Sequence, residues 1–163
     1  MSGAELTAIP IREATATDAP ALAVLRYRFR SAIGTPVEEE AAFVDRAAAW
    51  LRERLGRSPW RAWVAEAAGD RIVGNIFLQL VEKLPNPVVE AEAIGYITNL
   101  YVVPEYRRQG IGRRLLHAAL AACAPGEVDT LILWPTPESV ALYRKDGFAP
   151  PASILERPLP RGQ

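Results

Sequence analysis

The chain has 163 residues, half of them apolar, and its 19 basic side chains are balanced by 19 acidic ones. A chain of this length can form one domain with a substantial core, and a net charge of zero provides no overall field that would attract nucleic acid or an anionic membrane. The single cysteine and the single histidine exclude an internal disulfide and a cysteine-based zinc site. No signal peptide and no membrane-spanning run is recognisable. We therefore expect a single cytoplasmic domain over residues 1–163, without metal, nucleic-acid or membrane partners.

The first half of the chain predicts two helices between strands. Thr17 is the expected cap of the first helix, with Pro20 in its first turn, and Leu22, Leu25 and Phe29 recur at helical spacing. The elements expected here are a strand over 9–14, a helix after Thr17, a helix over 38–55, and two strands over 60–66 and 71–81 joined as a hairpin.

The second half alternates strands with helices. Thr136 is the expected cap of the last helix, with Pro137 at its first position and Gly147 after its end. The elements expected here are a strand over 94–103, a helix over 112–122, a strand over 129–134, a helix after Thr136 and an edge strand over 153–159. This order favours one mixed sheet flanked by helices.

A basic, glycine-containing loop follows the strand that ends at Pro104. Residues 101–116 read YVVPEYRRQGIGRRLL, so Gly110 and Gly112 lead directly into a helix. Free backbone N–H groups and the positive dipole end at a helix start suit a multiply charged phosphate. The arginines that flank this loop are Arg107, Arg108, Arg113 and Arg114.

Two common nucleotide-binding motifs do not fit this loop. A P-loop requires G-x-x-x-x-G-K-[ST], which the chain lacks, and a dinucleotide fingerprint requires a third glycine where Leu115 stands. The remaining pattern, Arg107-x-x-Gly110-x-Gly112, resembles the acyl-CoA motif R/Q-x-x-G-x-G/A of the GCN5-related N-acetyltransferases (the GNAT family). Residues 139–148, SVALYRKDGF, are similar to the family's second signature, in which a tyrosine precedes a Gly-Phe pair.

The resemblance implies the family's fold, donor and reaction. The implied fold is α/β in the mixed α+β sense, with a central, mostly antiparallel, splayed sheet flanked by helices. The implied reaction moves an acetyl group from acetyl-CoA to a primary amine, expected here on a small molecule, by direct attack in a ternary complex. Homodimerisation is common in the family.

The resemblance also assigns roles to individual residues. Tyr143 is the implied general acid for the departing thiolate. The strand edge at Leu100, Tyr101 and Val102 is expected to pair with the pantetheine arm, and an N–H such as that of Val102 could bind the thioester carbonyl. The residues implied in binding the coenzyme A pyrophosphate are Arg107, Arg108, Gln109, Gly110, Ile111, Gly112 and Arg113.

Two positions depart from the family pattern. Thr98 stands where many members carry a glutamate base, and Thr136 stands where many carry an asparagine that contacts the cofactor. The general base is left open among Glu90, Glu92, Tyr96 and a water chain through Thr98.

The acceptor is open as well. The two N-terminal helices usually shape the acceptor site in this family, and acids at 38–40 could attract a cationic amine. Two other functions stay open: a non-catalytic acyl-CoA-binding or sensing module, and acetylation of protein N-termini or lysines.

Overall fold

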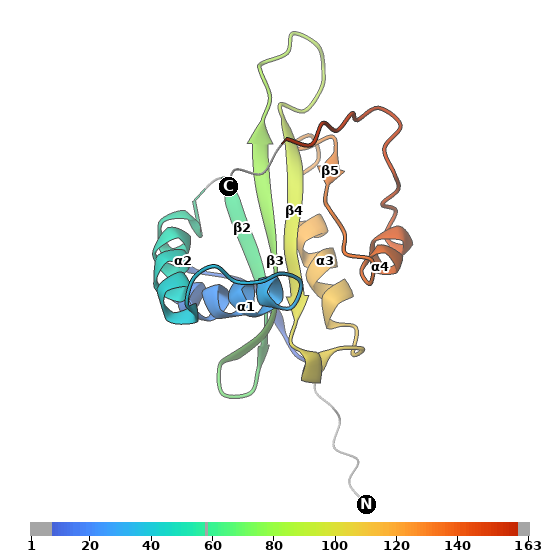
Figure 1. Ribbon diagram of the computed structural model, residues 1–163. Helices are drawn as coiled ribbons and strands as arrows, with labels where there is room; N and C mark the ends of the chain where they lie inside the picture. The colour runs from blue at the N-terminus through green and yellow to red at the C-terminus, as the bar shows by residue number, and fades with distance from the viewer. Residues whose placement is uncertain (1–7, 58, 160–163) are drawn as a thin grey trace, which may run out of the picture. The chain divides into compact units, whose positions relative to one another are not determined.

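The computed structural model describes residues 8–57 and 59–159, in two compact units. The first unit extends to Leu133 and the second begins at Trp134. The strands of the first unit are β1 (Ile11–Glu13), β2 (Trp60–Ala67), β3 (Arg71–Glu82), β4 (Ala93–Val102) and β5 (Leu131–Ile132) (Figure 1). Its helices are the 3₁₀ turns η1 (Ala16–Asp18) and η2 (Pro104–Tyr106) and the α-helices α1 (Ala19–Ser31), α2 (Glu40–Arg54) and α3 (Ile111–Ala121). The second unit contains α4 (Val140–Lys145).

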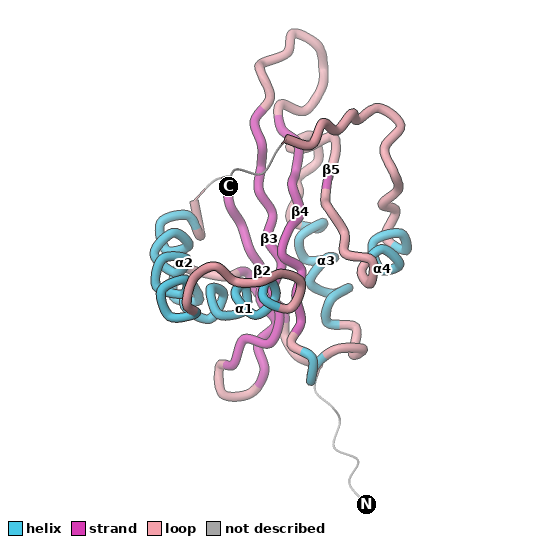
Figure 2. The backbone as a smooth tube through the Cα atoms, in the orientation of Figure 1, coloured by secondary structure: helices cyan, strands magenta, loops and turns pink. Residues whose placement is uncertain are grey.

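The strands form one sheet in the order β1-β2-β3-β4-β5. Neighbours from β1 to β4 are antiparallel, whereas β4 and β5 are parallel and pair only at Gly95–Leu131 and Tyr96–Ile132. Figure 2 shows β5 as a short segment beside a much longer β4. The mixed, mostly antiparallel and splayed sheet predicted from the sequence is confirmed.

Helices cover both faces of the sheet, with α1 and α2 in front in Figure 1 and α3 behind. Leu22 of α1 and Leu51 of α2 join a buried cluster with Val64 of β2. On the opposite face, Leu115 of α3 is fully buried, and a Cβ at Gly74 of β3 would lie only 3.2 Å from its Cδ1 atom. Glycine at position 74 therefore lets α3 pack close to the sheet.

None of the helices in the described part of the chain has both the length and the apolar character needed to span a bilayer. Across the same residues, histidine, cysteine, aspartate and glutamate form no group of three or more that could bind a metal ion.

The start of α1 differs from the prediction that Thr17 is its cap. Asp18, buried at 7% exposure, is the residue before the helix, and its carboxylate accepts a 2.8 Å hydrogen bond from the N–H of Thr15. Arg12 of β1 donates two hydrogen bonds of 2.8 Å to the same carboxylate. The carboxylate makes no hydrogen bond to α1 itself, and its two oxygens accept from Thr15 and Arg12 at once. Thr17 instead bonds the Thr15 hydroxyl at 2.7 Å.

Several predicted boundaries were too generous. The first strand is restricted to β1 and the second helix to α2, and the strand expected at 129–134 shrinks to β5 because only two of its residues pair with β4. The edge strand expected at 153–159 is wrong: the described residues there form no strand. Pro150, Pro151 and Pro158 supply no N–H donors, which disfavours pairing in that segment.

In the second unit, Thr136 does not cap the helix. Its carbonyl accepts hydrogen bonds from the N–H and the hydroxyl of Ser139, at 3.0 Å and 2.9 Å. These bonds close a turn, and Ser139 is the residue before α4. Proline at 137 stabilises the turn because its φ is already fixed.

We predict that Asp18→Asn lowers the free energy of unfolding by about 1–3 kcal/mol at pH 7, because it weakens charge-assisted hydrogen bonds to a buried group. The hydrogen bonds from Arg12 lower the pKa of Asp18 below its ordinary 3.8 in the folded state. The carboxylate therefore stabilises the fold above that pKa, and this contribution is lost as the pH falls below about 4. Urea unfolding at pH 7 and pH 3 should show the difference between wild type and variant shrinking in acid. Asp45→Asn on exposed α2 is the control, and an equal loss there would contradict the assignment.

Candidate active site

The edge of β4 is shaped by one extra residue. The register between β3 and β4 shifts between Asn75 and Phe77, where Asn75 faces Tyr101 but Phe77 faces Thr98. Asn99 adopts a φ of 55° at this point, a left-handed conformation that asparagine tolerates better than most residues. A bulge of this kind reverses which peptide groups face the neighbouring strand.

Beyond the bulge, the peptide group of Val102 faces away from β3. The N–H of Val103 donates to the Val73 carbonyl at 2.9 Å, so the preceding carbonyl, that of Val102, points to the opposite side. The Nε atom of Arg107 donates to that carbonyl at 2.9 Å. By alternation, Leu100 shares this direction. Because β5 pairs only with Gly95 and Tyr96, no strand of the described chain pairs with β4 at this edge.

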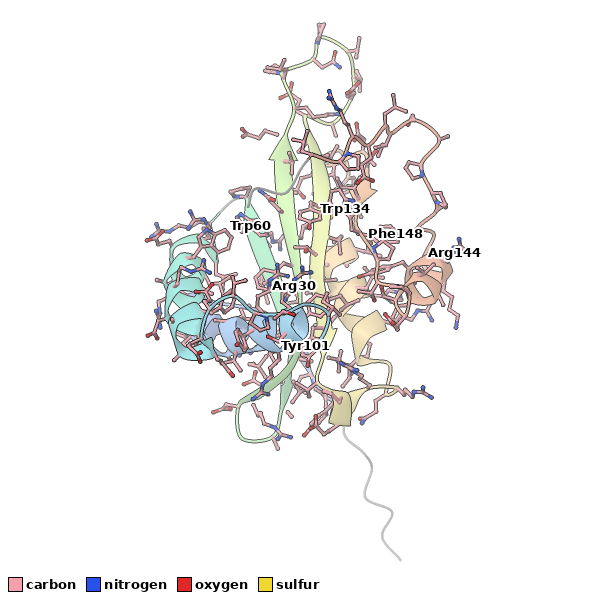
Figure 3. The ribbon with its side chains drawn as sticks, in the orientation of Figure 1. Arg30, Trp60, Tyr101, Trp134, Arg144 and Phe148 are labelled. Atoms are coloured by element: carbon pink, nitrogen blue, oxygen red, sulfur yellow. The ribbon has the colours of Figure 1, made fainter. Side chains whose placement is uncertain are left out.

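The backbone groups of Tyr101 point in the opposite direction to those of Leu100 and Val102. Its carbonyl lies 3.1 Å from the position of a Cβ on Gly74, so its peptide group belongs to the β3 side. Its ring is buried and packs on Phe29 with ring centroids 5.6 Å apart, beneath α1 in Figure 3. Of the three residues predicted to meet the pantetheine arm, Leu100 and Val102 have backbone groups directed toward the open edge.

The basic loop leads from this edge into α3. Gly110, the residue before the helix, has a φ of 74°, and Arg108 has a φ of 59°. The helical hydrogen bonds begin with Arg114, whose N–H donates to the Gly110 carbonyl at 3.1 Å. The N–H groups of Ile111 and Gly112 come before the first of these bonds, so they have no acceptor within the helix. Together with the helix dipole, such N–H groups suit an anion.

The side chains of the loop have distinct roles. Arg107 is turned back toward the strand, with its guanidinium 5.6 Å from the ring centroid of Tyr101 as well as bonded to Val102, so it fixes the loop against β4. Ile111 is buried at 3% exposure and anchors the helix, which leaves its backbone for binding. Arg108 and Arg113 are exposed, and Gln109 donates to the Glu105 carbonyl at 3.5 Å.

A cavity of about 330 Å³ lies in the first unit, between the two N-terminal helices and the sheet. Its volume is in the range of small-molecule sites. The residues that line it are Leu22, Arg26, Phe43, Arg46, Ala47, Trp50, Leu51, Trp60, Phe77, Tyr96, Thr98 and Asn99. Thr98 and Asn99 come from the part of β4 that immediately precedes the open edge, so the cavity and the edge share a strand.

A chain of polar contacts connects α1, the bulge and β3 at this cavity. Arg26 donates to the Oδ1 atom of Asn99 at 2.9 Å, and Asn75 donates from Nδ2 to the Asn99 carbonyl at 2.8 Å. Both asparagines are buried, at 0% and 6% exposure for Asn75 and Asn99. Burial, with a further contribution from Arg30, lowers the pKa of the Arg26 guanidinium. The contacts therefore hold a positive charge in a poorly solvated position.

The candidate bases are divided between two places. Tyr96 donates from its hydroxyl to the Thr98 hydroxyl at 3.1 Å, and both residues line the cavity beside α1 and α2. Glu90 and Glu92 instead line a separate cavity of about 710 Å³ beside the β3–β4 turn. The side chain of Glu90 also accepts a 2.8 Å hydrogen bond from Lys83. A hydroxyl pair, rather than a carboxylate, thus occupies the position to which the family resemblance assigns the base.

Tyr143 lies in the second unit, on α4. Its ring centroid is 5.6 Å from that of Phe148, and the N–H of Phe148 donates to its carbonyl at 3.1 Å. Gly147, with a φ of 89°, lets the backbone turn after α4 so that Phe148 can reach Tyr143. Burial raises the pKa of Tyr143 to about 12. The phenol is therefore protonated at neutral pH and can only donate its proton there.

Comparison with known proteins identifies the family. The model of the acetyltransferase (GNAT) domain matches residues 58–150, more than half of the chain. The chain belongs to the GNAT family of acetyltransferases. The predicted family and fold are thereby confirmed, and acyl transfer is the general activity that membership supports. No curated protein matches the sequence.

Solved structures support the same conclusion. A GCN5-related N-acetyltransferase from Ralstonia eutropha JMP134 is 28% identical with a TM-score of 0.75, over 92% of this chain and 97% of that one. A predicted acetyltransferase from Clostridium acetobutylicum, solved with acetyl-CoA, is 19% identical with a TM-score of 0.75, over 91% of this chain and 95% of that one. The GNAT fold therefore accounts for nearly the full length of the chain.

Sequence reasoning missed Arg26 and Asn99 as parts of the site. Arg26 lies outside the apolar stripe predicted for its helix, and the helical pattern gives no information on its distance from β4. Asn99 interrupts an otherwise apolar strand pattern, ITNLYVV. An asparagine at such a position is the available signal for a bulge.

We predict that Gly110→Ala lowers the free energy of unfolding by about 1–2 kcal/mol, because an L-residue is strained at positive φ. No heavy atom lies within 4 Å of the position of a Cβ there, so steric contact adds nothing to that loss. Gly110→Asn should lose less, since asparagine tolerates the left-handed region. Chemical denaturation measures the free energy of unfolding of the three proteins, which should decrease in the order wild type, Gly110→Asn, Gly110→Ala. An alanine variant as stable as wild type would show that the left-handed conformation is not required.

Proposed function

We propose that this GNAT protein transfers the acetyl group of acetyl-CoA to the primary amine of a small molecule, by direct attack in a ternary complex. The observation that carries the proposal is the direct succession, within one unit, of an unpaired β4 edge and the start of α3. An extended arm bearing amides suits the edge, and a pyrophosphate suits the helix start. These are the two parts of coenzyme A that the family resemblance assigns to these positions.

The residues fit coenzyme A in further respects. The open space around Gly110 leaves room for a ligand to approach the loop backbone. The pyrophosphate would be held by the N–H groups of Ile111 and Gly112, with Arg108 and Arg113 exposed nearby. The pantetheine arm would pair with the peptide groups of Leu100 and Val102. Arg107 would act by keeping strand and loop in register, since its side chain is bonded to Val102.

The reaction needs three events at the thioester. The amine nitrogen forms a bond to the carbonyl carbon, the carbon–sulfur bond breaks, and one proton moves overall from nitrogen to sulfur. The N–H of Val102 would stabilise the negative charge that develops on the carbonyl oxygen. Tyr143 would donate the proton to the thiolate. Because its pKa of about 12 exceeds the thiol's reference pKa of about 8.5, the donation must be coupled to proton loss from nitrogen, which restores the phenol.

A small acceptor is supported by the cavity beside α1 and α2. A volume of about 330 Å³ is in the range of small-molecule sites and suits a molecule of modest size. Its wall includes Thr98 and Asn99, directly before the β4 edge at which the thioester would lie. An amine held there would be adjacent to the acetyl group.

We expect the protein to release thiol from acetyl-CoA only when an amine acceptor is present, and to form an N-acetylated product. Thiol release across a panel of amines, with product identified by mass spectrometry, tests this. Calorimetric titration with coenzyme A measures donor binding independently. Binding of coenzyme A without transfer to any amine would instead indicate a non-catalytic binding module. No binding at all would contradict the donor site.

We predict that Tyr143→Phe lowers kcat by about 100-fold, the effect of removing a general acid, while the KM for acetyl-CoA changes little. The ring that packs on Phe148 is retained, so the melting temperature should stay the same. Steady-state kinetics and thermal melting measure the two quantities. An unchanged kcat would show that Tyr143 is not the acid.

The raised pKa of Tyr143 also fixes the shape of the pH profile. Because the phenol stays protonated up to a pKa of about 12, kcat/KM should rise from pH 7 to about pH 9.5 as more of the amine loses its proton, with no alkaline decline. Initial rates in overlapping buffers measure this profile. A decline between pH 8 and 9.5 that is absent in Tyr143→Phe would contradict it.

A further inference from the structure

The cavity beside α1 and α2 contains a guanidinium without an acidic partner. Arg26 lines the cavity and is half-buried, and its hydrogen bond in the described chain goes to the neutral amide of Asn99. No carboxylate of the described residues lies within ion-pair distance of it. Arg30, one turn further along α1, adds positive potential. The charge is therefore incompletely compensated by the protein.

Other arginines of the fold, unlike Arg26, are paired with carboxylates. Arg12, which is more exposed than Arg26, is bonded to Asp18 and Glu66. Arg46, which also lines the cavity, forms an ion pair with Glu38. That pairing removes Glu38 as an attractor for a cationic amine. An anionic group on a ligand is thus the group that the cavity lacks.

The rest of the cavity wall is apolar and aromatic. Trp60 packs edge-on against Trp50 and Phe77, with ring centroids 5.2 Å and 6.5 Å away. Trp60 lies beside α2 in Figure 3, and Phe43 adds a further ring to the lining. A wall of this kind, around a volume of about 330 Å³, suits an apolar side group the size of an aromatic ring.

We infer that the acceptor is an amine that carries a carboxylate close to its nitrogen and an apolar, ring-sized side group, as in an aromatic α-amino acid, with the carboxylate bound by Arg26. This inference rests on the proposed acetyl transfer and adds the substrate class. Arg26 is bonded to Asn99, the residue immediately before Leu100 at the open edge. A carboxylate on Arg26 therefore holds an adjacent amine next to the position of the thioester, while the side group enters the aromatic part of the cavity. Guanidinium is well suited to this because its planar fork can donate hydrogen bonds to both carboxylate oxygens.

The first test needs only the wild-type protein and matched amines. Phenylalanine, phenylalanine amide and phenethylamine share a ring and a primary amine, but only phenylalanine has a carboxylate. We expect kcat/KM with acetyl-CoA to be about 10- to 100-fold higher for phenylalanine, the range for a hydrogen bond to a charged group. Equal or better acetylation of phenethylamine would overturn the inference and leave the proposed function intact.

The second test assigns the effect to Arg26. Arg26→Gln should reduce the preference for phenylalanine over phenethylamine to about one, through a raised KM for phenylalanine, with coenzyme A binding unchanged. Arg26→Lys should retain part of the preference because it keeps the charge. Arg28→Gln, on the exposed side of the same helix, is the control and should keep the full preference. A loss of activity toward both amines in equal proportion would indicate a structural role and overturn the assignment.

A binding measurement tests the carboxylate preference separately from the proposed acetyl transfer. Calorimetric titration of phenylalanine and phenethylamine, in the presence of coenzyme A, does not depend on catalysis. Tighter binding of phenylalanine that Arg26→Gln abolishes supports carboxylate binding by Arg26 even where no amine is acetylated, and in that case the proposed acetyl transfer fails together with the acceptor role that depends on it. Absence of a carboxylate preference in binding overturns the inference.

Discussion

The extra residue in β4 at Asn99 is the constraint on which both sides of the active site depend. Peptide groups alternate in direction along a strand, so one inserted residue turns those of Leu100 and Val102 toward the open edge. The left-handed φ of 55° at Asn99 is unfavourable in isolation, and hydrogen bonds to both its carbonyl and its side chain hold it. Without the bulge, the same residues would direct their peptide groups at β3, and the edge would present the wrong partners to an extended ligand.

The same asparagine connects the open edge of β4, where we propose that the donor binds, to the cavity beside α1 and α2, where we propose that the acceptor binds. Its carbonyl is fixed by Asn75 from β3 and its side chain by Arg26 from α1, so strand conformation and helix position are coupled through one residue. Placing a guanidinium there has a cost, because a half-buried charge with a neutral partner keeps only part of its solvation. An apolar residue on this face of α1 would serve packing better. Groups held in such unfavourable environments are concentrated at functional sites, which is why Arg26 is better explained by a ligand than by folding.

Much of the fold could be predicted from the sequence because apolar spacing and turn residues act locally. The β2–β3 hairpin, the end of β4 at Pro104 and the start of α3 at Gly110 all follow from such signals. Long-range pairing could not be predicted: β5 pairs with β4 only at Gly95 and Tyr96, which the apolar run at 129–134 does not reveal. In the candidate site, the turn from the glycine loop into α3 is local and was predicted, whereas Arg26 reaches Asn99 across 73 positions of sequence. A contact of that range depends on how α1 packs on the sheet.

The environment of Arg26 also bears on the general base. An alkylammonium with a pKa of about 10.4 needs about 4–5 kcal/mol to lose its proton at pH 7, and the described cavity wall provides the Tyr96–Thr98 hydroxyl pair rather than a carboxylate. A nearby guanidinium and an apolar wall both disfavour the charged form of an amine, which lowers its pKa. A carboxylate on the proposed acceptor would neutralise Arg26 in part and so reduce the first effect, whereas the effect of the apolar wall would remain. An amine whose pKa is lowered in this way would need less help from a base, and the hydroxyl pair would have only to carry its proton to water. A threonine at the position of the family's glutamate is then compatible with catalysis.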